Sequence, residues 1–201
     1  ELRFAHLKYH LAMLEVLTLE CAALSTVSAL GLLDGHMVFK PLAMVFAIVF
    51  VATRSYFTRA ITRFEALLLG ALVFSLGGDV FLMLPGNYFI PGLASFLVAH
   101  IFYIALFRQG QAWFPSKPAL LAVLAVGASM YAIVWGGLGD PVLKIAVAAY
   151  VSVISLMAAQ AIGRATVQGD AAARWVALGA CVFMVSDSLI AINKFVTPVA
   201  L

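Results

Sequence analysis

The stretch LLLGALVFSLGGDVFLM, residues 67–83, is apolar over most of its length and contains one acidic residue, Asp79. An α-helix needs about 20 predominantly apolar residues to cross the hydrocarbon core of a bilayer. A second stretch of the same kind, WVALGACVFMVSDSLIAINK at residues 175–194, also contains a single acidic residue, Asp187. Both stretches therefore predict membrane-spanning helices that contain a carboxyl group.

The composition of the whole chain indicates a membrane protein. Of the 201 residues, 65% are hydrophobic and only 10% are charged, whereas soluble domains have about 45–50% and about 25%. A soluble fold of this size could not bury so much apolar surface. The net charge of +3 is spread along the chain without a basic cluster, which argues against nucleic acid as a partner.

Seven apolar runs are long enough, or nearly long enough, to span a membrane. The connectors between them contain glycine, proline, asparagine and aspartate, which interrupt helices. We therefore predict an all-α, polytopic transmembrane bundle that forms one domain over residues 1–201, with an eighth helix expected beyond residue 201. The predicted spans are 12–33, 38–53, 66–84, 88–107, 118–136, 143–162 and 174–193.

Lysine and arginine are divided unequally between the two sets of connectors. Nine lie in the N-terminal arm and near 54–65, 108–117 and 163–174. The other three are Lys40, Lys144 and Lys194. Positive residues favour the cytoplasmic side, so we expect a cytoplasmic N-terminus. The compact loops favour an integral protein of a bacterial inner membrane. In this orientation, the C-terminal ends of the spans that contain Asp79 and Asp187 lie on the outer side of the membrane.

Asp79 and Asp187 are the strongest catalytic candidates, because charged groups at membrane depth are costly and usually functional. Each lies about six residues before the outer end of its predicted span, or about 9 Å below the outer boundary. Gly77, Gly78 and Gly179 would let neighbouring helices approach closely. Two adjacent carboxyl groups in a low dielectric can share one proton and supply a general acid and a general base.

A packing role is the alternative for both acidic residues. Each carboxylate could accept hydrogen bonds from a serine or a lysine and only hold helices together. The donors available for such a role are Ser75, Ser186, Ser188 and the lysines.

Several other polar side chains are candidates for binding a substrate. Lys40, with Lys144 and Lys194, could hold a phosphate at the mouth of a cavity, or these side chains could simply extend to the membrane interface. His100 is the only histidine inside a predicted span, so a histidine-rich metal site cannot be built, and a packing role for it stays open. We predict no metal and no cofactor. The candidate binding residues are Lys40, His100, Tyr103, Tyr150, Ser186, Asn193 and Lys194.

Four short motifs follow one another along the chain. They are Lys40-Pro41-Leu42, Leu76-Gly77-Gly78-Asp79, Ala99-His100 with Tyr103, and Ser186-Asp187-Ser188 followed by Asn193-Lys194. In this order they resemble the lysoplasmalogenase (YhhN-like) family of integral membrane proteins, over about residues 38–196. Each motif is short by itself, so the resemblance depends on the ordered set. The family is similar to an eight-helix design.

The resemblance implies hydrolysis of the vinyl-ether bond of a lysoplasmalogen, giving a fatty aldehyde and a glycerophospho-base. The implied partners are a lysophospholipid substrate and membrane lipid, with the phosphate near Lys40 at the outer leaflet. A protonated aspartate can protonate the vinyl ether, and an ionised one can stabilise the resulting cation and activate water. Which of Asp79 and Asp187 takes which role stays open at this point, as does the oligomeric state.

Other functions are compatible with intramembrane aspartates. A small proton-coupled transporter could use the same pair as a proton relay, although the sequence has no evident inverted repeat. An intramembrane aspartyl protease is a further alternative, although Asp79 lacks the preceding tyrosine typical of such enzymes. A lipid hydrolase acting on another linkage also remains open, because carboxyl groups do not encode the identity of the substrate.

Overall fold

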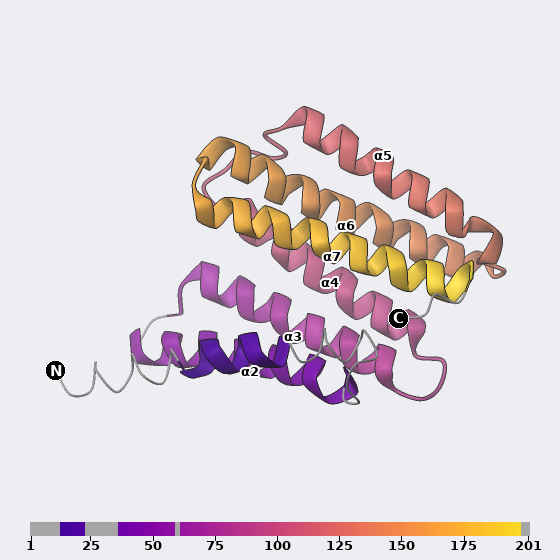
Figure 1. Cartoon of the computed structure of the whole chain (residues 1–201). Coiled ribbons are helices and arrows are strands. Elements are labelled where there is room, and N and C mark those ends of the chain that lie inside the picture. The colour runs from indigo at the N-terminus through magenta and orange to yellow at the C-terminus, as the bar shows by residue number, and fades with distance from the viewer. Residues whose placement is uncertain (1–12, 23–35, 59–60, 198–201) are drawn as a thin grey trace. The chain divides into compact units, whose positions relative to one another are not determined.

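The computed structural model describes residues 13–22, 36–58 and 61–197 of the chain (Figure 1). Residues 13–22 are helical, and all of the described secondary structure consists of helices and turns, which confirms the predicted all-α fold. A short 3₁₀ helix, Trp135–Gly137, follows α5. The longer helices are α2 (His36–Thr58), α3 (Arg63–Met83), α4 (Phe89–Phe107), α5 (Lys117–Val134), α6 (Pro141–Gln168) and α7 (Ala171–Phe195).

Six of the described helices are long and apolar enough to cross a membrane. They confirm six of the seven predicted spans, and the chain is an integral membrane protein. The first predicted span, 12–33, lies largely outside the described residues. The predicted second span, 38–53, is too short, because α2 continues to Thr58. Its last turns contain Arg54, and a long polar side chain can extend from a helix end toward water.

Local signals determine where several helices begin and end. Thr62 and Glu65 form a capping box at the start of α3, in which each side chain accepts a hydrogen bond from the other residue's backbone N–H. Asp140 and Asp170 cap α6 and α7 more simply, because each side chain accepts one hydrogen bond from a backbone N–H of the first turn. Between these two helices, Gly169 adopts φ +68°, a left-handed conformation that glycine accepts without strain.

The described chain forms two compact units, which are divided within α4 between Ala99 and His100. In the first unit α2 and α3 pack as an antiparallel pair (Figure 1). The first half of α4 also contacts α3, where the Ser95 hydroxyl donates a hydrogen bond of 2.6 Å to the Phe74 carbonyl. In the second unit α6 packs against both α5 and α7. That all of these helices form one domain stays a prediction.

The most buried helix of the second unit is α6, and small residues line it. Ala158, Ala159 and Ala161 are fully buried, and such residues let neighbouring helices approach closely. Large apolar side chains on the other helices are exposed, including Leu121 on α5 at 69% and Trp175 on α7 at 72%. Exposed apolar surface of this extent suits contact with lipid rather than water.

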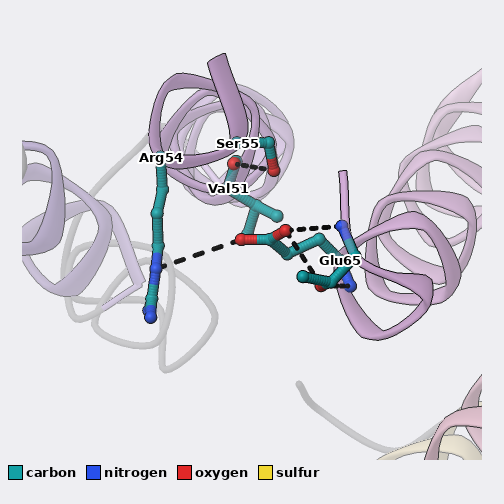
Figure 2. Close-up of polar contacts among 5 residues, drawn as sticks. Val51, Arg54, Ser55 and Glu65 are labelled. Carbon is teal, nitrogen blue, oxygen red and sulfur yellow. Dashed lines mark hydrogen bonds and ion pairs between the residues drawn. The ribbon is translucent and has the colours of Figure 1, made fainter. Parts of the chain in front are cut away.

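The α2–α3 pair carries an ion pair near the connection between the two helices (Figure 2). The Glu65 carboxylate accepts hydrogen bonds from the backbone N–H and the hydroxyl of Thr62, and its other oxygen lies 4.0 Å from Arg54 Nε. The Arg54 side chain is 64% exposed, so solvent screens this pair. It contributes little to stability and mainly marks the membrane-interface end of the two helices.

Candidate functional site

In the first unit the predicted catalytic residue Asp79 forms an ion pair with Lys40. Asp79 is 4% exposed, and its Oδ1 lies 2.7 Å from Lys40 Nζ. Lys40 is four residues from the start of α2, and Asp79 is four residues from the end of α3. Because the helices are antiparallel, these two positions lie at the same level. The structure therefore brings together two predicted site residues.

The glycines before Asp79 bring α4 close to α3. A Cβ at Gly78 would overlap the ring of Phe96, and a Cβ at Gly77 would lie 2.8 Å from Ser95 Oγ. The close approach predicted for this segment thus involves α4. Ser75, one turn before Asp79, is 2% exposed, and its hydroxyl has no hydrogen-bond partner among the described residues. Ser75 therefore does not donate a hydrogen bond to Asp79, although the packing alternative named it as a possible donor.

In the second unit the predicted catalytic residue Asp187 accepts a hydrogen bond from Tyr150. The Tyr150 hydroxyl, on α6, donates to Asp187 Oδ2, on α7. Tyr150 is nine residues from the start of α6, and Asp187 is eight residues from the end of α7. The two antiparallel helices therefore place these groups at one level. Tyr150 is buried, whereas Asp187 is only partly buried.

His100 packs behind this hydrogen bond. The His100 side chain is buried, at 1% exposed. Its ring lies nearly perpendicular to the rings of Tyr150 and Phe183, at interplanar angles of 74° and 79°. The ring centroids are 5.4 and 5.2 Å apart. Perpendicular arrangements of this kind are favourable for aromatic rings. His100, Tyr150, Phe183 and Asp187 form what we call the tyrosine cluster. Sequence reasoning selected three of its members but did not predict that they contact one another.

The other predicted binding residues lie on α4 and α7. Tyr103 stacks on Phe107, one turn later in α4, with ring centroids 5.8 Å apart. Ser186 is exposed beside Asp187, and Asn193 and Lys194 are exposed in the last turn of α7. A cation near a helix C-terminus is favourable because of the helix dipole. Whether these side chains touch a substrate stays a prediction.

Lys144 behaves as an interfacial residue. Its ammonium lies 4.2 Å from the centre of the Trp135 ring, a cation–π distance. This geometry supports the interfacial alternative for this lysine rather than a role in phosphate binding.

The offsets of the two carboxyl groups from their helix ends differ. The sequence predicts about six residues for both, but Asp79 lies four residues before Met83 and Asp187 eight before Phe195. The reason is that α7 extends beyond residue 193, the predicted end of its span, whereas α3 ends at Met83, before the predicted residue 84. The carboxyl groups belong to different units, and a shared proton between them stays a prediction.

A further polar residue, Gln160, has a structural role. Gln160, fully buried on α6, accepts a hydrogen bond from the Phe114 N–H and donates one to the Ala112 carbonyl. Its amide thus holds the α4–α5 connection. Among the described residues there is no group of three or more His, Cys, Asp or Glu residues that could bind a metal ion.

Comparison with known proteins gives a family. The YhhN family profile matches residues 35–201. A Mycobacterium bovis protein named lysoplasmalogenase is 32% identical over 170 residues, which cover 82% of this chain and 63% of that protein. Human lysoplasmalogenase TMEM86B is 33% identical over 135 residues, covering 67% and 54%. Bovine lysoplasmalogenase TMEM86A is 36% identical over 133 residues, covering 64% and 53%.

The chain spans less than two thirds of the length of these relatives. No solved structure matches it. The profile match covers most of the chain and agrees with the resemblance carried by its four ordered motifs. The chain therefore belongs to the YhhN family.

Proposed function

We propose that this protein hydrolyses the vinyl-ether bond of lysoplasmalogens to give a fatty aldehyde and a glycerophospho-base. The observation that carries the proposal is that relatives matching 64–82% of this chain are named lysoplasmalogenases. The two carboxyl groups within apolar helices, each with a polar partner, support it, because the reaction requires acid–base groups and no redox step.

The proposed reaction starts with transfer of a proton to the β-carbon of the vinyl ether. The double-bond electrons form the new C–H bond, and the α-carbon becomes part of an oxocarbenium cation. Water adds to that carbon and loses a proton to a carboxylate, which gives a hemiacetal. Cleavage of its C–O bond to the glycerol then releases the aldehyde and the alcohol. We propose that Asp79 and Asp187 both take part, as the acid–base and charge-stabilising groups.

The proposed substrate is a lysophospholipid that enters from the surrounding bilayer. Its single hydrocarbon chain would lie against apolar side chains, and its phosphate would lie near the outer ends of the helices. Lys40 has three N–H donors, so it can serve Asp79 and a phosphate oxygen together. Asn193 and Lys194, in the last turn of α7, would be further phosphate contacts. Tyr103 and Ser186 keep their predicted roles as substrate contacts.

The proposal is tested by measuring aldehyde release from a 1-alkenyl lysophospholipid by the protein purified in detergent. Asp79→Asn and Asp187→Asn should each lower kcat at least about a hundredfold, the scale of a lost general acid or base. Asp140→Asn is the matched control, because Asn also caps a helix well and Asp140 lies at the exposed start of α6. Full activity of either folded intramembrane variant would contradict the proposed mechanism.

Substrate identity is tested with a panel of lysolipids that differ only in the linkage at the first glycerol carbon. Mass spectrometry should show cleavage of the alkenyl linkage and none of the alkyl linkage, because only the alkenyl chain has a carbon that can be protonated to a stabilised cation. Equal cleavage of the acyl linkage would indicate a different lipid hydrolase. Uptake into proteoliposomes without any hydrolysis would favour a transporter.

A further inference from the structure

The buried hydroxyl of Ser75 does not make the hydrogen bond that other helical serines make. The hydroxyls of Ser55, Ser129, Ser152 and Ser188 each donate to the backbone carbonyl four residues earlier. The Ser75 side chain is 2% exposed, yet its hydroxyl has no hydrogen-bond partner among the described residues. Burying a hydroxyl without a partner costs free energy. Ser75 is therefore suited to hold a polar molecule that enters from outside the helix.

Ser75 lies on the same face of α3 as Asp79, one helical turn before it. Residues four apart on a helix are neighbours, with Cβ atoms about 5–6 Å apart, and Asp79 is also buried. One water molecule can bridge two groups at this spacing, because each of its hydrogen bonds spans about 2.8 Å. A carboxylate can accept about four hydrogen bonds, so the ion pair of Asp79 with Lys40 does not exclude a bond from water.

Hydrolysis among apolar helices needs a water molecule at a depth where few groups can hold one. On the basis of the proposed hydrolysis, we propose that Ser75 and Asp79 together hold the water that adds to the oxocarbenium carbon. The water donates one O–H to the Asp79 carboxylate and the other to Ser75 Oγ. A lone pair of its oxygen is then directed at the carbon. Both residues belong to the first unit, on a single helix.

In the proposed step a lone pair of the water oxygen forms the new C–O bond. The O–H bond that points to Asp79 breaks, its electrons stay on the oxygen, and its proton passes to the carboxylate. The cation and the water thus become a neutral hemiacetal, and Asp79 becomes a carboxylic acid. Ser75 exchanges no proton, and its hydroxyl contacts only the reacting water.

Ser155, in the second unit, is the matched reference for Ser75. Its side chain is 1% exposed, and its hydroxyl also has no hydrogen-bond partner among the described residues. A Cβ at Gly127 would overlap Ser155 Oγ, so this hydroxyl packs directly against α5. The residues one turn away on α6, Val151 and Ala159, are apolar. Ser155 therefore has the burial of Ser75 without a carboxylate beside it.

The test is a competition between water and methanol for the cation, followed by mass spectrometry of the products. Water gives the aldehyde, whereas methanol loses its one O–H proton to Asp79 and gives a mixed acetal that keeps the glycerol. Methanol cannot also donate to Ser75, so the wild type should favour water. At a fixed methanol concentration, Ser75→Ala should raise the ratio of acetal to aldehyde at least about threefold, the scale of one hydrogen bond. Ser155→Ala should leave this ratio unchanged.

Kinetics and a second pair of variants complete this test. Ser75→Ala should lower kcat roughly three- to tenfold, with KM within about twofold, because Ser75 holds the water and not the lipid. Ser75→Thr and Ser75→Val have nearly the same shape and differ in the hydroxyl. Ser75→Thr should keep the product ratio of the wild type and Ser75→Val should raise it, also if Ser75→Ala does not fold. An unchanged ratio without the hydroxyl, an equal rise in Ser155→Ala, or a change in KM alone would overturn the proposal.

Thermal unfolding in detergent tests the water site without turnover. A hydroxyl that holds water contributes hydrogen bonds, so Ser75→Ala should lower the unfolding midpoint. Ser155→Ala removes a hydroxyl without a partner and should not lower it. A midpoint for Ser75→Ala at or above that of the wild type, or an equal decrease in both variants, would overturn the proposal. No aldehyde release by the wild type, together with a lower midpoint for Ser75→Ala alone, would contradict the proposed function and support the water site.

Discussion

The two units satisfy an acidic side chain inside apolar helices in different ways. In the first unit Lys40 compensates the charge of Asp79 across the α2–α3 pair. In the second unit a neutral phenol contacts Asp187 across the α6–α7 pair, within the tyrosine cluster. The ammonium carries a charge opposite to that of a carboxylate, whereas the phenol is neutral. Two carboxyl groups in similar apolar helices therefore have chemically different partners.

A second contrast lies within the first unit. Its α2–α3 pair has two ion pairs, the buried one at Asp79 and the exposed one between Arg54 and Glu65 (Figure 2). The buried pair has the shorter N–O distance, 2.7 Å against 4.0 Å. Its cation is also less exposed, at 35% against 64%. The exposed pair is therefore a natural reference for what the buried pair contributes.

The largest expected effect on stability is that of removing Lys40. Lys40→Met should lower the free energy of unfolding by about 2–3 kcal/mol, because it leaves the Asp79 carboxylate buried without its counter-ion. Arg54→Met should cost at most about 1 kcal/mol, as expected for an exposed pair. Both are measured by denaturant unfolding in detergent. Equal losses of unfolding free energy in the two variants would show that the buried ion pair stabilises the protein no more than the exposed one.

An intermediate effect is expected at the glycine that precedes Asp79. Gly78→Ala should cost about 1–3 kcal/mol, because its Cβ would overlap the Phe96 ring and α4 would have to shift. Gly179, on the helix of Asp187, has no atom within 4 Å of a built Cβ among the described residues. Gly179→Ala should therefore be neutral or stabilise by up to about 1 kcal/mol, through helix propensity. A similar loss at both positions in thermal unfolding would contradict the assignment of the close helix contact to Gly78 rather than to Gly179.

The smallest expected effect is at the hydrogen bond between α4 and α3. Ser95→Ala should lower the free energy of unfolding by about 1 kcal/mol, because it removes a neutral hydrogen bond to the Phe74 carbonyl. The control is Ser152→Ala, whose exposed hydroxyl donates only to the Ala148 carbonyl of its own helix. That variant should change stability by less than about 0.5 kcal/mol. Unfolding of both variants in the same detergent provides the comparison.

Much of the fold could be predicted from the sequence. Six spans were placed correctly because a run of apolar residues of sufficient length is a local property. Their ends were less accurate: α2 continues through Arg54, and α7 continues past residue 193 to Phe195. At these ends polar residues remain helical while they extend to the interface, so hydropathy alone does not show where the helix stops.

The candidate site was predicted only as a set of residues. Asp79, Lys40, Asp187, Tyr150 and His100 were all selected because polar groups are costly in lipid. The packing alternative allowed a lysine beside either carboxylate, but it named neither Lys40 for Asp79 nor Tyr150 for Asp187. The glycines at 77 and 78 indicated a close helix contact, but not that α4 makes it.

The sequence by itself determined that the chain is a bundle of membrane helices and that two of them contain a carboxyl group. Only the tertiary structure decided that a lysine faces one carboxyl group and a tyrosine the other. Each residue turns a helix by about 100°, so an uncertainty of one residue in the alignment of two helices points a side chain at a different neighbour. Apolar length tolerates such an uncertainty, and the pairing of two polar groups does not.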